Sequence, residues 1–387
     1  MAAYKYYFYD LLSHTLLDEM GGAMFGVNFS MFLSGKIGSK VGQFTGTFRA
    51  DTPGRKVQDL LDATTPGKTA LWIDRDDQPV WCGIVWSRTY QATGRTYELS
   101  AQTYESYPHE VYNSSDASAT EPCQDFVSIA WGAVQGVSSS YNLGVAVPAL
   151  QGTGTTITKS FVGTDYNSWG DFIDDMAAAG AEFYIKPTKD VNGNRVPQLV
   201  VGRWDLVENP PTTYYRIGVP VAQALISGVD LQYPTGISEY WWPENAIQAA
   251  NRVLAIGKAN GASTPHQIYT NPSNLAQGYP GLDNRLTLSD IDAQGTLNAI
   301  AAAQLTNMQP PILTPTIMLD GNVEGAFGSW SLGDNVKLVI DDPYRFPNGP
   351  VTGVTRIVGY SLTPSSQNGP ETVNLTIDTI SNLTGVA

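Results

Sequence analysis

The chain has 387 residues, of which 42% are hydrophobic and 15% are charged, so its composition is that of a folded globular protein and not of a fibrous or disordered one. Its formal net charge of −14 disfavours the broad basic footprint of a conventional DNA- or RNA-binding protein. No apolar run reaches the ~18–20 residues of a membrane span, and residues 1–10 lack the layout of a signal peptide. We therefore expect a soluble protein, not exported through a signal peptide, with about two to four domains.

Residues 1–106 are predicted to form a small antiparallel β domain. Short runs of aromatic and β-branched residues alternate with polar turns such as Ser34-Gly35 and Asp74–Gln78. The expected strands are Tyr4–Asp10, Phe25–Leu33, Phe44–Arg49, Thr69–Ile73, Val80–Thr89 and Arg95–Ala101, with a short helix over Arg55–Ala63. Short strands joined by polar turns favour a barrel or sandwich over a parallel sheet.

The middle of the chain is predicted to mix helices and strands. Residues 107–210 are expected to form an α+β insertion, and residues 211–310 a mixed segment that partly completes the first barrel. The expected elements are helices at 122–136, 168–179, 243–256 and 289–308, a hairpin of Glu182–Lys186 with Gln198–Val201, and a strand-rich stretch over 213–233. The hairpin prediction rests on the Asn192-Gly193 turn signal.

Residues 311–387 return to strand patterns and form a second candidate barrel. The expected strands are Thr316–Leu319, Val336–Ile340, Val354–Thr363 and Thr372–Thr379. The predicted fold is therefore mainly β with α+β insertions: two small antiparallel β-barrel domains, one at each end of the chain, and α+β domains between them.

No motif in the sequence carries recognisable catalytic chemistry. The three histidines occur in neither an HExxH nor an HxH arrangement, and there is no Gly-x-Ser-x-Gly elbow. Cys82 and Cys123 lack the CxxC spacing of a zinc site and are interpreted as two buried thiols. We predict a protein that is not an enzyme, with no catalytic residue, metal ligand or cofactor.

The aromatic run Tyr240-Trp241-Trp242 has two interpretations. Aromatic residues are enriched in the core and in subunit interfaces, which is the preferred interpretation here. The alternative is a sugar-stacking platform beside an acid such as Glu239 or Glu244, as in a carbohydrate-binding or glycan-cleaving protein acting on a host cell surface.

The segment Thr69–Tyr104 resembles the tail-hub type of minor tail protein found in long-tailed phages (siphoviruses) of actinobacteria. In these proteins a strand ends in a polar turn and leads into a W-x-G-x-I/V strand, and the match here is carried by Trp81, Gly83 and Ile84. The repeat over Gly42–Phe48 resembles the N-terminal barrel of the same proteins.

The segment Leu332–Ile377 resembles the closing barrel of such hubs, with Gly333, Asp334 and Gly359 at turn positions. The resemblance implies a homotrimeric ring in the baseplate or tail tip, in which each chain contributes two tube-like barrels. Such a ring adapts a sixfold tail tube to a threefold tip and encloses the channel through which DNA is ejected.

The implied partners are the distal tail or tail tube protein, the tape measure protein and downstream tip or fibre proteins, with DNA only passing through. The implied location is the virion tail tip, after assembly in the host bacterial cytoplasm. A lumen lined by acidic residues would repel the DNA backbone, which agrees with the net charge of −14.

Overall fold

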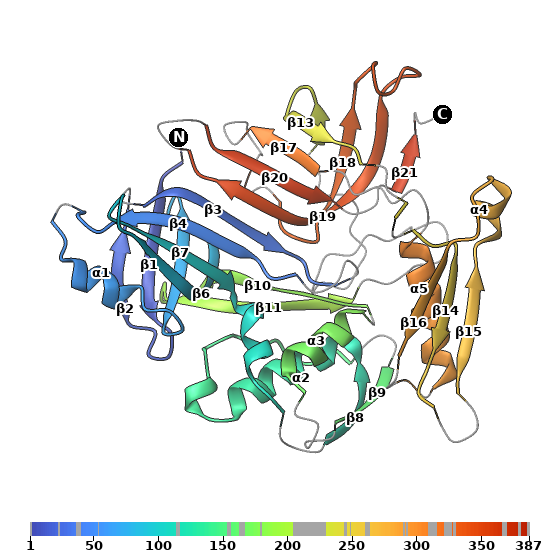
Figure 1. Ribbon diagram of the computed structural model, residues 1–387, viewed down its shortest axis with the longest axis horizontal. Helices are drawn as coiled ribbons and strands as arrows, with labels where there is room; N and C mark the ends of the chain where they lie inside the picture. The colour runs from blue at the N-terminus through green and yellow to red at the C-terminus, as the bar shows by residue number, and fades with distance from the viewer. Residues whose placement is uncertain are drawn as a thin grey trace.

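The protein is described from a computed structural model (Figure 1). The structure describes residues 2–21, 24–35, 40–52, 54–113, 117–152, 156–161, 167–178, 180–203, 230–243, 246–247, 249–259, 264–288, 291, 293–308, 316–320, 327, 330–365, 370–377 and 381–384. These residues form two β units that share one continuous sheet, an α+β insertion beneath the first unit, and a small α/β unit at one end of the molecule (Figure 1). The predicted fold class, mainly β with α+β insertions, is confirmed.

The first β unit comprises the N-terminal strands and one short helix. Its elements are β1 (Tyr4–Asp10), β2 (Leu16–Met20), β3 (Met24–Phe32), β4 (Gln43–Arg49), α1 (Val57–Ala63), β5 (Thr69–Arg75), β6 (Gln78–Gln91) and β7 (Thr96–Thr103). They pair in the order β2-β1-β5-β6-β7-β4-β3. Every strand predicted for this region is present, and β2 is the one that the sequence analysis missed, because its residues Leu16 and Leu17 are both exposed and break the alternation of a half-buried strand.

The second β unit is assembled from segments on both sides of the small α/β unit. Its strands are β12 (Asp230–Tyr233), β13 (Ile237–Trp241), β17 (Thr316–Asp320), β18 (Asn335–Ile340), β19 (Val351–Thr363), β20 (Thr372–Ile377) and β21 (Ser381–Thr384). The main path is β12-β18-β19-β20-β17-β13, with β21 also pairing with β19. The strands of the 211–310 segment that flank the small unit, β12 and β13, thus belong to this second unit and not to the first, where the sequence analysis had placed part of that segment.

Neither β unit closes into a hydrogen-bonded barrel within the described residues. In the first unit the two terminal strands, β2 and β3, are consecutive along the chain, and in the second unit the same holds for β12 and β13. β12 and β13 are linked by a tight turn in which the amide of Gly236 donates to the carbonyl of Gln232 over 2.7 Å. Each unit is therefore a strongly curved sheet around an apolar interior.

The α+β insertion packs on the first β unit through a core of its own. Its elements are η1 (Tyr104–Glu110), β8 (Ala117–Pro122), α2 (Cys123–Gly136), η2 (Ser139–Tyr141), β9 (Thr156–Phe161), α3 (Trp169–Ala178), β10 (Ala181–Lys189) and β11 (Arg195–Arg203). Trp72, Cys82 and Ile84 of β5 and β6 are buried in one cluster with Phe126 and Trp131 of α2. The helices predicted at 122–136 and 168–179 and the β10–β11 hairpin are all present.

The small α/β unit has a three-stranded sheet covered on one side by a helix. Its elements are β14 (Arg252–Ile256), β15 (His266–Thr270), α4 (Pro272–Ala276), β16 (Asp283–Thr287) and α5 (Gln294–Asn307). The predicted helix over 243–256 is wrong, because β14 occupies its last five residues. There Val253 and Ala255 alternate with more exposed neighbours and pack against α5, so pairing with two strands overrides the helix-favouring alanines nearby.

Candidate functional site

The two β units have the same strand order and the same strand directions. In chain order, β2, β3, β4, β5, β6 and β7 of the first unit correspond to β12, β13, β17, β18, β19 and β20 of the second. The correspondence includes one unusual detail: β12 runs parallel to β18, and β2 likewise runs parallel to β5, because β1 lies between them and is antiparallel to both. The two units therefore share six strands in the same order, and they differ in that the first has the additional strand β1 and the second the additional strand β21.

Local details of the two units match as well. The ladder between β6 and β7 is interrupted between Val85 and Ser87, and the ladder between β19 and β20 is interrupted between Ile357 and Gly359. At each interruption a glycine amide bonds to the strand, which we call the glycine cap. The amide of Gly67 donates to the carbonyl of Val85, and the amide of Gly333 donates to the carbonyl of Ile357, each over 2.8 Å. Both glycines have positive φ, +73° and +88°. These matches define residue equivalences, with Ser87 corresponding to Gly359.

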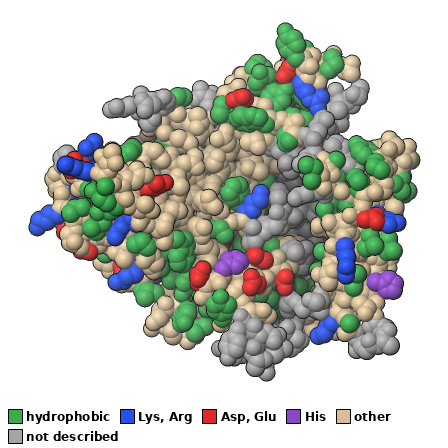
Figure 2. All heavy atoms as spheres, in the orientation of Figure 1, with side chains coloured by type: hydrophobic (Ala, Val, Ile, Leu, Met, Phe, Trp, Pro, Cys, Tyr) green, Lys and Arg blue, Asp and Glu red, His purple; other side chains and the backbone are tan. Residues whose placement is uncertain are grey.

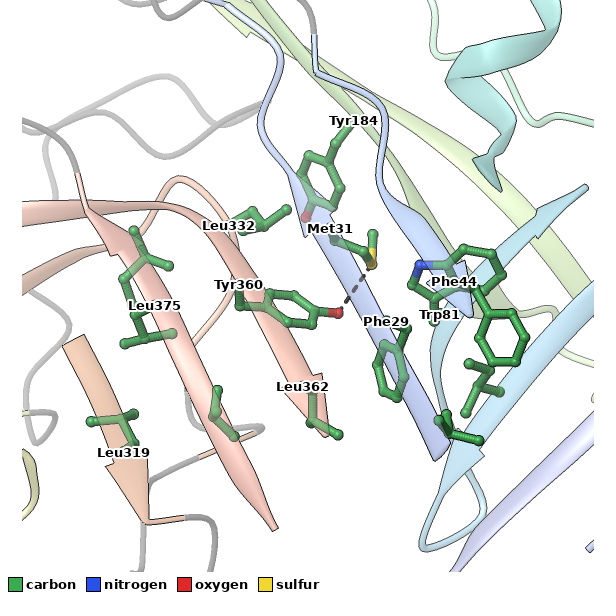
Figure 3. Packing of buried hydrophobic residues seen from close by; sticks show 14 of the residues in the cluster. Phe29, Met31, Phe44, Trp81, Tyr184, Leu319, Leu332, Tyr360, Leu362 and Leu375 are labelled. Atoms are coloured by element: carbon green, nitrogen blue, oxygen red, sulfur yellow. Dashed lines mark hydrogen bonds between the residues drawn. The ribbon is translucent and has the colours of Figure 1, made fainter. Parts of the chain in front are cut away.

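The two units are joined edge to edge by an antiparallel ladder between β3 and β19 (Figure 1). Phe29–Phe32 pair with Gly359–Leu362. Trp81 donates its indole N–H to the carbonyl of Ser30 over 2.9 Å, and the hydroxyl of Tyr360 contacts the Val80 carbonyl at 2.9 Å. Figure 3 shows Tyr360 reaching from the second unit toward Met31, whose sulfur lies 3.0 Å from the same hydroxyl. One hydrophobic core therefore runs through both units.

The joint produces one uncovered sheet face that spans both units, which we call the open face. It runs over β6-β7-β4-β3-β19-β20-β17-β13, and the ladders place alternate residues of each strand on it. Most of these residues are uncharged and polar: Ser87, Thr89, Gln91, Thr96, Ser100, Gln102, Gln43, Thr45, Thr47, Asn28, Ser30, Ser361, Thr363, Thr372, Asn374, Thr376 and Thr316. Figure 2 shows this face as a broad area with few charged or hydrophobic side chains.

The glycines of the motif strands have a packing explanation. A Cβ on Gly83 would lie 2.2 Å from the Gln102 carbonyl oxygen and 2.5 Å from the Trp81 ring. A Cβ on Gly359 would lie 2.4 Å from the ring of Phe32, which therefore lies against Gly359 at the joint. The W-x-G pattern thus reflects close approach of a neighbouring strand and of the tryptophan ring itself.

The three aromatic residues singled out in the sequence lie at the free end of the open face. Tyr240 points into the second unit, where it contacts Tyr233 at 5.1 Å between ring centroids and donates to Asp342 over 2.5 Å. Desolvation, followed by the hydrogen bond to Asp342, raises the pKa of the Tyr240 hydroxyl well above its usual range. Trp242 packs edge-on against Phe346, with ring centroids 5.3 Å apart.

Trp241 has a different environment from its two neighbours. It pairs with Thr316 on the open face, and 46% of its surface is exposed. Trp241 and Trp242 therefore point to opposite sides of the sheet and do not form a joint stacking platform for a sugar. Glu239 is exposed on β13, and Glu244, the other candidate acid, lies outside the described residues.

Three further expectations concern reactive groups and membranes. Cys82 and Cys123 are both buried and are not joined in a disulfide, and burial raises the pKa of the Cys82 thiol. Among the described residues, no group of three or more His, Cys, Asp or Glu side chains is arranged to hold a metal ion. No helix in the described part of the chain is long and apolar enough to cross a membrane.

No protein-family model matches the chain, and no curated protein matches it. Solved structures do. The 43 kDa tail protein of prophage MuSo2 from Shewanella oneidensis aligns over 96% of this chain and 98% of its own, with a TM-score of 0.59 and 9% identity. A tail protein from Neisseria meningitidis aligns over 96% of both chains (TM-score 0.56, 13% identity).

A third structure, prophage tail protein gp18 from Listeria monocytogenes, aligns over 96% of this chain and 94% of its own, with a TM-score of 0.54 and 11% identity. The chain thus has the fold of prophage tail proteins along nearly its whole length. At these identities the likeness establishes the fold and not the activity.

The sequence analysis missed the feature that defines the site, namely the continuity of one sheet across both ends of the chain. Phe29–Phe32 and Gly359–Leu362 are separated by more than three hundred positions, and nothing local marks them as partners. A signal was present in the solvent-facing positions of β4, β7 and β20, which are mostly Thr, Ser, Gln and Asn.

Proposed function

We propose that this protein is a structural phage tail protein that forms a homotrimeric ring at the tail tip, adapts the sixfold tail tube to a threefold tip and surrounds the DNA channel. The observation that carries the proposal is the duplication of one β unit within the chain, with the two copies joined side by side. Because each chain contributes two equivalent units, a ring of three chains contains six equivalent units, and one gene product can match a sixfold tube. The shared fold with prophage tail proteins supports the same assignment.

The open face is the candidate wall of the channel. It is the surface that both units share, and its hydroxyl and amide groups offer no strong attraction to phosphates. This differs from the acidic lumen proposed from the net charge, because the chemistry of the face is mainly neutral, with Glu98 among its few charged residues. A mainly neutral hydrated wall allows DNA to pass because it holds few cations: Arg49 lies on this face, but its guanidinium is ion-paired with Asp51.

The implied neighbours follow from this position in a tail. The distal tail or tail tube protein would contact one side of the ring, downstream tip or fibre proteins the other, and the tape measure protein the lumen. The small α/β unit and the insertion both lie outside the open face and are available for such contacts (Figure 1).

The ring is tested by light scattering of the purified protein, followed by negative-stain imaging of the same peak. A mass near three times 41.8 kDa with ring-shaped particles is the expected result. A compact monomer at every concentration examined contradicts the proposal.

The channel wall is tested by adding cations to it. Thr45→Lys together with Thr376→Lys places positive charges on the open face of both units, and we expect the variant ring to retain duplex DNA that the unaltered ring does not bind. The matched control is Thr287→Lys with Gln198→Lys, at exposed positions of the small unit and the insertion. Equal DNA retention by both variants would rule out the open face as the channel wall.

A further inference from the structure

The β3–β19 joint lies inside one chain, and the duplicated units contain the equivalent strands for a second joint of the same kind. In the joint, β3 of the first unit adds to the outer edge of β19 in the second. The equivalents of these strands are β13 and β6. We propose that β13 of one copy adds to the edge of β6 in a second copy, in the same register as β3 on β19. This inference rests on the proposed ring and names the contact that closes it.

Both edges required for this contact are unpaired within the described residues. The first part of β6, up to Ile84, pairs with β5, whereas Ser87–Gln91 pair with β7 alone. The first part of β19 similarly pairs with β18, but its later residues pair with both β20 and β3. On the other side of the contact, β13 pairs with β17 alone. Such exposed edges are normally covered, because they bind further strands.

The capping glycine does not obstruct the edge of β6. Gly67 caps Val85 in the same way that Gly333 caps Ile357. In the second unit that cap coexists with the added strand β3, which begins to pair at Gly359. Pairing from Ser87 onward is therefore compatible with the geometry of the first unit.

The ladders define the register residue by residue. In the first unit, successive cross-strand partners from β3 to β6 are Asn28, Thr45, Ser100 and Ser87. In the second unit, the successive partners from β13 to β19 are Trp241, Thr316, Thr376 and Gly359. Because Ser87 corresponds to Gly359, Asn28 corresponds to Trp241. The same steps equate Thr363 with Gln91 and Leu362 with Tyr90.

The correspondence places two tryptophans of one copy against β6 of the next copy. Within the chain, the Asn28 amide donates to the Thr363 hydroxyl over 2.9 Å, and Phe29 lies opposite Leu362. Between copies, Trp241 would lie against Gln91, and Trp242 against Tyr90.

Exposure agrees with this assignment. Leu362 is fully buried by its partner strand, whereas its equivalent Tyr90 is 51% exposed. Trp241 is 46% exposed at the other edge. Aromatic side chains of this kind are typical anchors of subunit interfaces. The contact is head to tail, so repeated use generates a closed ring if the rotation closes and a filament if it does not.

The test is a disulfide across the proposed contact. Gln91→Cys and Trp241→Cys are introduced into one chain, which is then oxidised and analysed on a non-reducing gel. We expect covalent dimers and a covalent trimer that reduction abolishes. Each single variant should give dimers at most. The control variant carries Gln43→Cys with Trp241→Cys. Gln43 lies on β4, which is paired on both sides, so this variant should give no series of crosslinked species on the gel.

A positive control uses the joint that is already visible. Asn28→Cys with Thr363→Cys should form an intramolecular disulfide that protects both thiols from alkylation without changing the mass. The natural cysteines Cys82 and Cys123 are buried and should not contribute to the ladder.

The outcomes separate this inference from the proposed function. A trimeric mass without the Gln91–Trp241 crosslink overturns the contact and leaves the ring intact. A crosslinked ladder that extends beyond the trimer supports the contact and overturns the three-chain ring. A monomer that never crosslinks overturns both.

A second measurement uses side-chain truncation. Tyr90→Ala should raise the concentration at which the assembly half-dissociates by about tenfold or more. Tyr112→Ala, which removes a 61% exposed tyrosine from the insertion, should leave it unchanged. An equal effect of the two variants would overturn the assignment of Tyr90 to the contact.

Discussion

Arg356 of β19 and Glu182 of β10 form a buried two-pronged ion pair that joins the second β unit to the insertion. The guanidinium donates to both carboxylate oxygens, over 2.7 and 2.5 Å, and its Nε–H donates to the carbonyl of Gly333 over 3.0 Å. Both side chains are almost completely buried. The pair therefore ties the insertion to the capping glycine loop of the second unit.

Loss of one partner of this pair should destabilise the protein strongly. In Glu182→Gln the Arg356 charge stays buried without its counterion, and we expect the free energy of unfolding to fall by about 3–5 kcal/mol. Replacing both residues with Glu182→Leu and Arg356→Met should recover most of the loss, because an apolar pair avoids the desolvation penalty. Urea denaturation measures both. A single variant as stable as the unaltered protein would show that the pair is not buried.

The joint between the β units should be sensitive to one hydroxyl group. Tyr360→Phe removes the hydroxyl that donates to the Val80 carbonyl and contacts the Met31 sulfur, and we expect a loss of about 1–3 kcal/mol because a partly buried carbonyl loses its donor. Tyr344→Phe is the control, since Tyr344 is 99% exposed and its substitution should change stability by less than about 0.5 kcal/mol. Equal thermal midpoints for the two variants would contradict this role of Tyr360.

The glycine of the W-x-G motif should tolerate no side chain. Gly83→Ala would place a methyl group 2.2 Å from the Gln102 carbonyl oxygen, so β6 and β7 would have to separate, at a cost of about 1–3 kcal/mol or more. Gly132→Ala is a matched control on α2, because a Cβ at this position meets nothing within 4 Å. This substitution should stabilise the helix by about 0.5–1 kcal/mol. Denaturant midpoints that shift in the same direction would refute the packing explanation.

The sequence predicted the elements of the first β unit well because their signals are local. Period-2 alternation over Gln43–Arg49 and the polar turn at Asp76-Asp77 place strands and connections without reference to the rest of the chain. The motif residues Trp81 and Gly83 were also identified, although the bond of Trp81 to β3 at the joint and the packing of Gly83 against β7 were not.

The site itself could not be predicted from local signals. The open face depends on the pairing of β3 with β19, and its register is set by packing around Tyr360 and Met31, far apart in sequence. β14 was mistaken for a helix for a related reason: Asn251 donates to Pro280 and accepts from the amide of Leu282, so contacts with distant backbone place the strand. Trp241 and Trp242 were singled out from the sequence as one aromatic run, but their opposite orientations follow from the strand and not from the run.

A buried carboxyl group at the base of the insertion should make stability depend on pH. Glu105 is fully buried in η1, and its Oε1 accepts a hydrogen bond from the amide of Ile185 over 2.6 Å. Burial raises the pKa of this carboxyl above the value of 4.5 that it has in the unfolded chain. The folded state therefore keeps its proton after the unfolded state has lost it, so stability falls as the pH rises from 4.5 through the raised pKa.

Glu105→Gln removes this titration and preserves an oxygen acceptor for Ile185. The difference in unfolding free energy between the variant and the unaltered protein should therefore increase in favour of the variant as the pH rises from about 4 to about 8. Denaturation with urea across this pH range measures it. Glu110→Gln changes the net charge equally at an exposed position of the same helix, and it should show no such trend. Parallel stability curves for Glu105→Gln and the unaltered protein would mean that Glu105 ionises normally in the folded state and that the η1–β10 contact is open to water.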